Sequence, residues 1–232
     1  MQIGIGLLGR KVGMTQVFDQ EGRAVPVTVV EAGPCPIVQR KSAERDGYEA
    51  VQIGYLPVKA KRGSKPLSGH FAKANVAPLR YLQEMRLHSA AEYQVGQTLT
   101  VDLFTEGEEV VVTGKSKGRG FQGGVKRWGY RGGAKSHGSM FHRAPGSIGA
   151  SSFPSRVFKG HRMPGRMGGD RVTIRGSRVV RRDPGRNLLL IQGALPGPQG
   201  GLLTIRKAGK EVAGSQPAEG PEKKAKAEGQ SG

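Results

Sequence analysis

The feature of this sequence that most constrains its fold is a long stretch without any carboxylate. No Asp or Glu occurs between Glu109 and Asp170. Residues 111–187 contain 18 Lys and Arg against 2 Asp and Glu, whereas residues 1–110 contain 13 and 12, so most of the net charge of +19 comes from one segment. Solvated protein faces mix charges of both signs. The stretch therefore predicts binding to an external polyanion.

Short β-branched segments separated by turn residues flank the basic stretch on both sides. A short helix is expected at 69–76. Strands and hairpins are expected at 3–8, 12–18, 25–30, 49–55, 98–104 with 109–113, 171–182 with 187–193, and 202–206. The apolar residues of 79–87 fit neither the helical nor the strand period cleanly, and between helix and strand this segment is taken as a strand. Strands on both flanks predict a mainly β fold, in which one closed β barrel carries a long inserted basic extension that lacks regular structure.

The expected domain organisation has three parts. Residues 1–113 and 171–210 form the β-barrel domain, and residues 114–170 form the inserted basic extension. Residues 211–232 are predicted to be a disordered tail, because Val212 is their only sizeable apolar side chain and cannot offset the entropy of ordering.

Several protein classes are excluded by composition. Cys35 is the only cysteine, so an internal disulfide and a thiolate zinc site are both excluded, and a reducing compartment fits. The longest aliphatic run, residues 188–191, is far shorter than the roughly 20 residues of a spanning helix. The N-terminus has no secretory signal pattern. We therefore expect a cytoplasmic protein with no membrane partner.

The sequence contains no convincing enzyme motif. Gly114-Lys115-Ser116 resembles the end of a phosphate-binding loop, but Glu109 stands where that motif needs its first glycine. His137, His142 and His161 have no carboxylate or thiolate nearby, and their cationic surroundings disfavour a metal ion. We predict a protein that is not an enzyme and has no metal, no cofactor and no small-molecule substrate.

Aromatic residues interleaved with Arg and Gly indicate what the basic stretch binds. Phe121, Trp128, Tyr130, Phe141 and Phe153 lie within it, whereas simple disordered basic tails are poor in aromatics. Aromatic rings stack on bases, and glycines permit close backbone approach to phosphates. A segment that orders on folded RNA is favoured; charge alone leaves DNA open, although no DNA-recognition element is visible. The expected RNA-binding residues are Lys115, Lys117, Arg119, Lys126, Arg127, Trp128, Arg131, Lys135, His142, Arg143, Arg156, Lys159, Arg162 and Arg166.

Six motifs, in order along residues 2–207, resemble one known family. They are the segments 8–18 (LGRKVGMTQVF), 114–121 (GKSKGRGF), 146–149 (GSIG), 156–160 (RVFKG), 165–168 (GRMG) and 186–190 (RNLLL). Together they resemble the bacterial form of the universal large-subunit ribosomal protein L-three.

This resemblance implies a barrel at the subunit surface and an extension that penetrates the large-subunit ribosomal RNA. It further implies binding near the 3′ end of that RNA, an early role in assembly, neighbouring large-subunit ribosomal proteins as partners, and a location in the ribosome. The extension tip near the peptidyl-transferase centre would consist of Ala150, Ser151, Ser152, Phe153 and Pro154. Many bacterial relatives carry a Gln-Asn-Gln segment with a methylated glutamine at 150–152, and this chain has Ala-Ser-Ser there.

Two functional hypotheses of different classes remain from the sequence. The favoured one is a structural RNA-binding constituent of the large ribosomal subunit. The alternative is a free RNA chaperone, or an RNA-acting enzyme with a barrel core. Sedimentation with ribosomes through a high-salt wash separates them, because a free chaperone held by charge alone dissociates.

Overall fold

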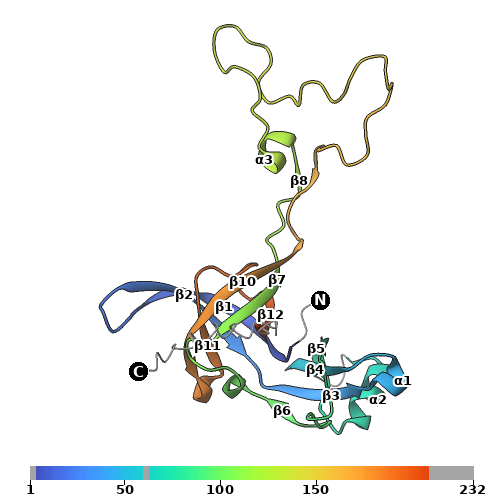
Figure 1. The fold of residues 1–232 in the computed structure, drawn as a ribbon, viewed down its shortest axis with the longest axis vertical. Helices are drawn as coiled ribbons and strands as arrows, with labels where there is room; N and C mark the ends of the chain where they lie inside the picture. The colour runs from blue at the N-terminus through green and yellow to red at the C-terminus, as the bar shows by residue number, and fades with distance from the viewer. Residues whose placement is uncertain (1–3, 60–62, 209–232) are drawn as a thin grey trace, which may run out of the picture.

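A computed structural model describes residues 4–59 and 63–208 of the chain, which is mainly β (Figure 1). Six antiparallel strands close into a barrel in the order β1-β12-β7-β10-β11-β2. Their bounds are β1 Gly6–Phe18, β2 Ala24–Ala32, β7 Glu109–Lys115, β10 Arg171–Asp183, β11 Leu188–Gln192 and β12 Leu202–Lys207. The closed barrel that the sequence predicts is confirmed. The two segments predicted at 3–8 and 12–18 form the single strand β1, and residue 3 lies outside the described residues.

Alternating apolar residues explain why these strands close around a core. Val110 and Val112 on β7, and Leu203 and Ile205 on β12, are fully buried. Successive side chains of a strand point to opposite faces, so residues two apart share the inner face. Each Å² of apolar surface removed from water stabilises the fold by roughly 25 cal/mol, so these inward-facing apolar side chains are the main stabilising feature of the barrel.

A second sheet packs against the barrel and was not predicted. Its four strands run in the order β5-β4-β3-β6, with bounds β3 Cys35–Lys41, β4 Ala50–Pro57, β5 Leu79–Arg86 and β6 Thr98–Leu99. The prediction that all strands belong to one barrel is therefore wrong for 49–55 and 79–87. These strands instead share one continuous core with the barrel, and the Tyr55 hydroxyl donates a 3.0 Å hydrogen bond to the Glu31 carbonyl of β2.

The predicted hairpin of 98–104 with 109–113 is also wrong. Within 98–104 the only strand is β6, and it pairs with Cys35 and Pro36 of β3. The chain then turns through a 3₁₀ helix, Val101–Leu103, where the Thr100 hydroxyl donates to Asp102 at 2.9 Å. Such local side-chain bonds compete with strand pairing. Strand β7 pairs with β10 and β12 instead.

Helices are few and short in the described part of the chain. Helix α2, Lys65–Lys73, begins earlier than the predicted 69–76 and covers the second sheet through Phe71, which packs against Val38. Helix α1, Ala43–Asp46, is a single turn, and a 3₁₀ helix, Pro184–Arg186, joins β10 to β11. None of the helices in residues 4–59 and 63–208 is long and apolar enough to cross a membrane.

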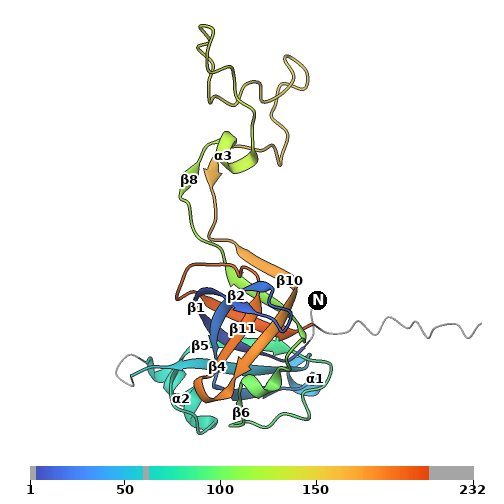
Figure 2. The same ribbon diagram turned by 90° about the vertical axis from the view of Figure 1, so that its left-hand side faces the viewer.

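The basic stretch leaves the barrel between β7 and β10 and projects far from it (Figure 1). Figure 2 shows it at one end of the molecule, with the barrel in the middle and the second sheet and α2 at the other end. It is largely irregular, as predicted, apart from β8 Phe121–Gln122, β9 Gly165–Arg166 and α3 Gly124–Trp128. The tail predicted at 211–232 lies outside the described residues.

Candidate nucleic-acid interface

The extension begins as a two-stranded neck, which we define as residues 115–122 and 165–171. The Arg119 amide donates to the Met167 carbonyl at 2.8 Å, and the Met167 amide donates to the Gly120 carbonyl at 2.9 Å. The Ser116 amide donates to the Asp170 carbonyl at 2.8 Å, and the Ser116 hydroxyl accepts from the Asp170 amide at 3.1 Å. Strands β8 and β9 pair at the outer end of the neck. These bonds prolong the β7–β10 ladder away from the barrel.

Close backbone approach in the neck requires glycine at position 168. Gly168 has a φ of +72°, the left-handed region that glycine adopts without cost. A Cβ at this position would lie closer than 3.0 Å to the Lys117 carbonyl oxygen of the opposite limb. The two limbs of the neck therefore touch here.

Beyond the neck lies the head, residues 123–164, whose inner part is fastened by Trp128. The Trp128 Nε1–H donates to the Met163 carbonyl at 2.9 Å, and the Arg127 guanidinium donates to the same oxygen at 2.7 Å. The Arg127 and Arg162 guanidinium carbons lie 4.9 and 5.5 Å from the Trp128 ring centroid. The Tyr130 hydroxyl donates to the Arg162 carbonyl. These contacts join α3 to a segment some 35 residues further along the chain.

The outer head is held mainly by backbone contacts and ends in an exposed tip. The Gly133 amide donates to the His142 carbonyl at 2.9 Å, and His142 Nδ1 lies 3.0 Å from the Ala134 carbonyl oxygen. The predicted tip residues form a turn in which the Phe153 side chain is 88% exposed.

The cations of the extension have no carboxylate partners within the described chain. Ion pairs do form elsewhere, as between Lys41 and Glu84 at 2.8 Å or Arg10 and Glu31 at 2.7 Å. None of the ion pairs among residues 4–59 and 63–208 involves a residue between 110 and 170. The positive charge of the extension is thus available to an external anion.

The structure places the predicted RNA-binding residues along the full length of the extension. Lys115 lies at the end of β7; Lys117, Arg119 and Arg166 lie in the neck; the others lie in the head. Arg127 is partly buried, and the other thirteen are exposed. Ring contacts join Arg127, Trp128 and Arg162 into one cluster.

Two features of this interface were missed from the sequence. The Met163 carbonyl, a backbone group with no sequence signature, is the anchor of the Trp128 cluster. Lys11 of β1 lies beside Lys117, although more than a hundred residues separate them, and local spacing cannot reveal such a neighbour. The barrel thus contributes a cation to the base of the extension.

The described residues offer little for chemistry or metal binding. No group of three or more His, Cys, Asp or Glu side chains that could hold a metal occurs within them. Cys35 is fully buried, and burial raises the pKa of its thiol to about 12. A thiol in that state is a packing residue rather than a nucleophile.

Comparison with known proteins places the chain in a family. The model for "Ribosomal protein L3" matches residues 83–188, which include the whole extension. The large ribosomal subunit protein uL3 of Carboxydothermus hydrogenoformans is 56% identical over 205 residues, which cover 88% of this chain and 98% of the relative. The chain belongs to the ribosomal protein L3 family. The uL3 proteins of Acidothermus cellulolyticus and Heliobacterium modesticaldum are 58% and 57% identical, again over 88% of this chain, and over 93% and 96% of their own lengths.

Membership of the L3 family confirms the resemblance seen in the sequence motifs. The chain is a structural constituent of the large ribosomal subunit and not an enzyme, as the sequence analysis predicted. The barrel is the part of the fold that carries the extension, and the extension is the part whose charge has no internal partner.

Proposed function

We propose that this protein binds large-subunit ribosomal RNA through its extension while the barrel stays at the subunit surface. The observation that carries the proposal is the absence of ion pairs along residues 111–169, combined with the exposure of nearly all their cations. RNA phosphates supply the missing negative charge. Exposed rings such as Phe121 and Phe153 supply stacking surfaces for unpaired bases.

The family supports a more detailed version of this proposal. The extension runs toward the peptidyl-transferase centre, the protein binds near the 3′ end of the RNA and acts early in assembly, and it works in the cytoplasmic ribosome beside other large-subunit proteins. The tip at 150–154 has no group that titrates near neutral pH and no nucleophile with a base beside it. Any influence of the tip on peptide-bond formation therefore acts through RNA geometry.

The structure suggests a clean deletion to test RNA binding by the extension. Because Gly168 approaches Lys117 and Gly118 so closely, residues 119–167 can be excised and the ends rejoined with two glycines while β7 and β10 remain paired. This removes ten Lys and Arg and no carboxylate. Each phosphate contact contributes about 0.7–0.9 to the slope of log affinity against log salt, so the slope should fall by up to about 7–9.

The matched control is deletion of residues 211–232, which contain 3 Lys and 4 Glu. We expect this second deletion to leave the slope for large-subunit ribosomal RNA unchanged. Equal slopes for the extension deletion and the intact chain would refute the proposed binding surface. Loss of the intact chain from subunits during a high-salt wash would instead favour a free RNA chaperone.

A further inference from the structure

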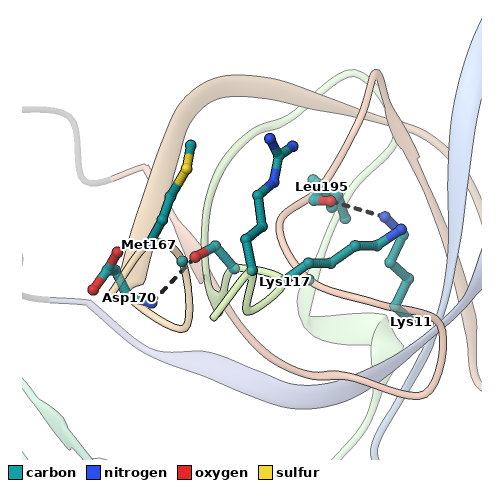
Figure 3. Close-up of a pocket in the computed structure, with 9 residues that line it drawn as sticks. Lys11, Lys117, Met167, Asp170 and Leu195 are labelled. Atoms are coloured by element: carbon teal, nitrogen blue, oxygen red, sulfur yellow. Dashed lines mark hydrogen bonds between the residues drawn. The ribbon is translucent and has the colours of Figure 1, made fainter. Parts of the chain in front are cut away.

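A cavity of about 530 Å³ lies where the extension meets the barrel (Figure 3). It is walled by β1, by both limbs of the neck and by the loop that follows β11, through residues that include Lys11, Lys117, Arg119, Met167, Asp170 and Leu195. The barrel and the extension therefore both contribute side chains to a single cavity. Its residues come from four separate parts of the sequence.

Two ammonium groups converge on one side of this cavity. Figure 3 shows the ends of Lys11 and Lys117 next to each other, with the Lys11 Nζ donating to the Leu195 carbonyl at 2.8 Å. The pKa of Lys11 is lowered, first by partial burial and then by the positive charge of Lys117. Two cations are thus held together at a cost that a bound anion would remove.

The carboxylate of the cavity does not neutralise these cations. In Figure 3 the Asp170 carboxylate lies on the opposite side from Lys11 and Lys117. Within residues 4–59 and 63–208, no ion pair involves Lys11, Lys117, Arg119 or Asp170. The surplus positive charge favours an anion and repels a metal cation.

The backbone around the cavity is fixed. The Gly200 amide donates to the Lys11 carbonyl at 2.7 Å, and the Lys11 amide donates to the Gly201 carbonyl at 3.0 Å. Gly197 approaches the Lys115 carbonyl so closely that a Cβ there would lie 2.8 Å from it. The loop after β11 is therefore hydrogen-bonded to β1 and lies against the end of β7, which holds the Lys11 backbone in place. The Lys117 backbone lies between the neck hydrogen bonds of Ser116 and Arg119.

We propose that this cavity is a phosphate site, in which Lys11 of the barrel and Lys117 of the neck together hold one phosphodiester group of the bound RNA. This inference rests on the proposed RNA-binding function and adds a residue of the barrel wall to it. Ammonium groups bind phosphate as point charges, and two of them on one phosphate relieve their mutual repulsion. The shared phosphate fixes the direction in which the extension leaves the barrel.

The test measures the slope of log affinity against log salt concentration, because this slope depends on how many phosphates the protein neutralises and not on how many cations it uses. The variants are Lys117→Gln, Lys11→Met and the double variant, and the probe is large-subunit ribosomal RNA. A shared phosphate predicts that the double variant lowers the slope by about 0.7–0.9 and the affinity at 0.1 M salt by about five- to eightfold. Two independent phosphates would instead lower the slope by about 1.4–1.8.

Two controls keep the result interpretable. Lys73→Gln removes the same charge from the exposed face of α2, at the far end of the molecule, and should leave the slope unchanged. Lys117→Gln alone should lower the affinity, and it breaks no hydrogen bond of the barrel, so it gives a result even if Lys11→Met shifts the loop at Leu195.

The outcomes separate this inference from the proposed function. An unchanged slope in the double variant, or a loss of about 1.4–1.8, overturns the shared site. If the excision of residues 119–167 nevertheless flattens the slope, RNA binding by the extension stands and only the phosphate site falls. If that excision also has no effect, the proposed function itself is wrong.

Discussion

Replacing Gly168 with alanine should loosen the neck while leaving the barrel intact. Gly168 has a φ of +72°, and an alanine in the left-handed region costs about 1–2 kcal/mol. The new Cβ would also overlap the Lys117 carbonyl oxygen, so the two limbs must separate. Separation breaks the paired bonds between Arg119, Gly120 and Met167, each worth about 0.5–1.5 kcal/mol net. The free energy of opening the neck should therefore fall by about 2–5 kcal/mol.

Amide hydrogen exchange on the free protein measures this change directly. A loss of about 2 kcal/mol corresponds to roughly 30-fold faster exchange, so the Arg119 and Met167 amides should accelerate by at least that factor or reach the rate of an unprotected chain. Barrel amides such as those of Val112 and Ile205 should keep their protection, because they lie in the β7–β12 ladder.

Gly118→Ala is the matched control for this experiment. Gly118 lies in the same neck, has no positive φ, and a Cβ there would meet nothing within 4 Å. Its exchange should match that of the unchanged chain. Unaltered protection of Arg119 and Met167 in the Gly168→Ala variant would show that the limbs do not touch as described, and the account of the neck would be wrong.

Three further predictions concern other parts of the molecule. Trypsin should cleave the free protein at Arg131 and Arg143, which lie exposed in the irregular head, faster than the ribosome-bound protein; equal rates would contradict ordering on RNA. Iodoacetamide should leave Cys35 unmodified at pH 8 in the folded protein and label it after unfolding, because burial raises the pKa of the thiol to about 12. Rapid labelling of the folded chain would contradict this burial. The pKa of Glu84 is lowered, chiefly by the hydrogen bond from Lys41 and with a further one from Tyr48. The ionised carboxylate therefore adds to the free energy of unfolding above a pH of about 4.3, and this contribution is lost as the pH falls. Glu84→Gln should flatten the acid side of the profile of unfolding free energy against pH, and a profile identical to that of the unchanged chain would contradict the assignment.

The distribution of charge and the local sequence pattern were sufficient to predict a barrel that carries an inserted basic extension. The gap between Glu109 and Asp170 located the extension, because a run of unpaired cations destabilises a compact state through mutual repulsion. The hairpin of β10 and β11 was visible in Asp183-Pro184-Gly185, and in the structure Asn187 there takes a φ of +53°, which asparagine tolerates well.

Other features depend on contacts between residues far apart in sequence. Strand β3 was missed: it begins at Cys35, and its second residue, Pro36, lies opposite Thr98 of the short edge strand β6, a position that proline tolerates. Assignment of strands to two sheets depends on register across the whole chain, which periodicity within one strand does not encode. The approach of Lys11 to Lys117 follows from barrel closure and is equally invisible in local spacing.

A cryo-electron microscopy map of the large ribosomal subunit that contains this chain would show whether the extension lies within large-subunit RNA and the barrel outside it. We expect density for residues 119–167 surrounded by RNA, with phosphates beside the cations of the neck and head, and a barrel with one side open to solvent. An extension that lies on the subunit surface, free of RNA, would show that the proposed function is wrong.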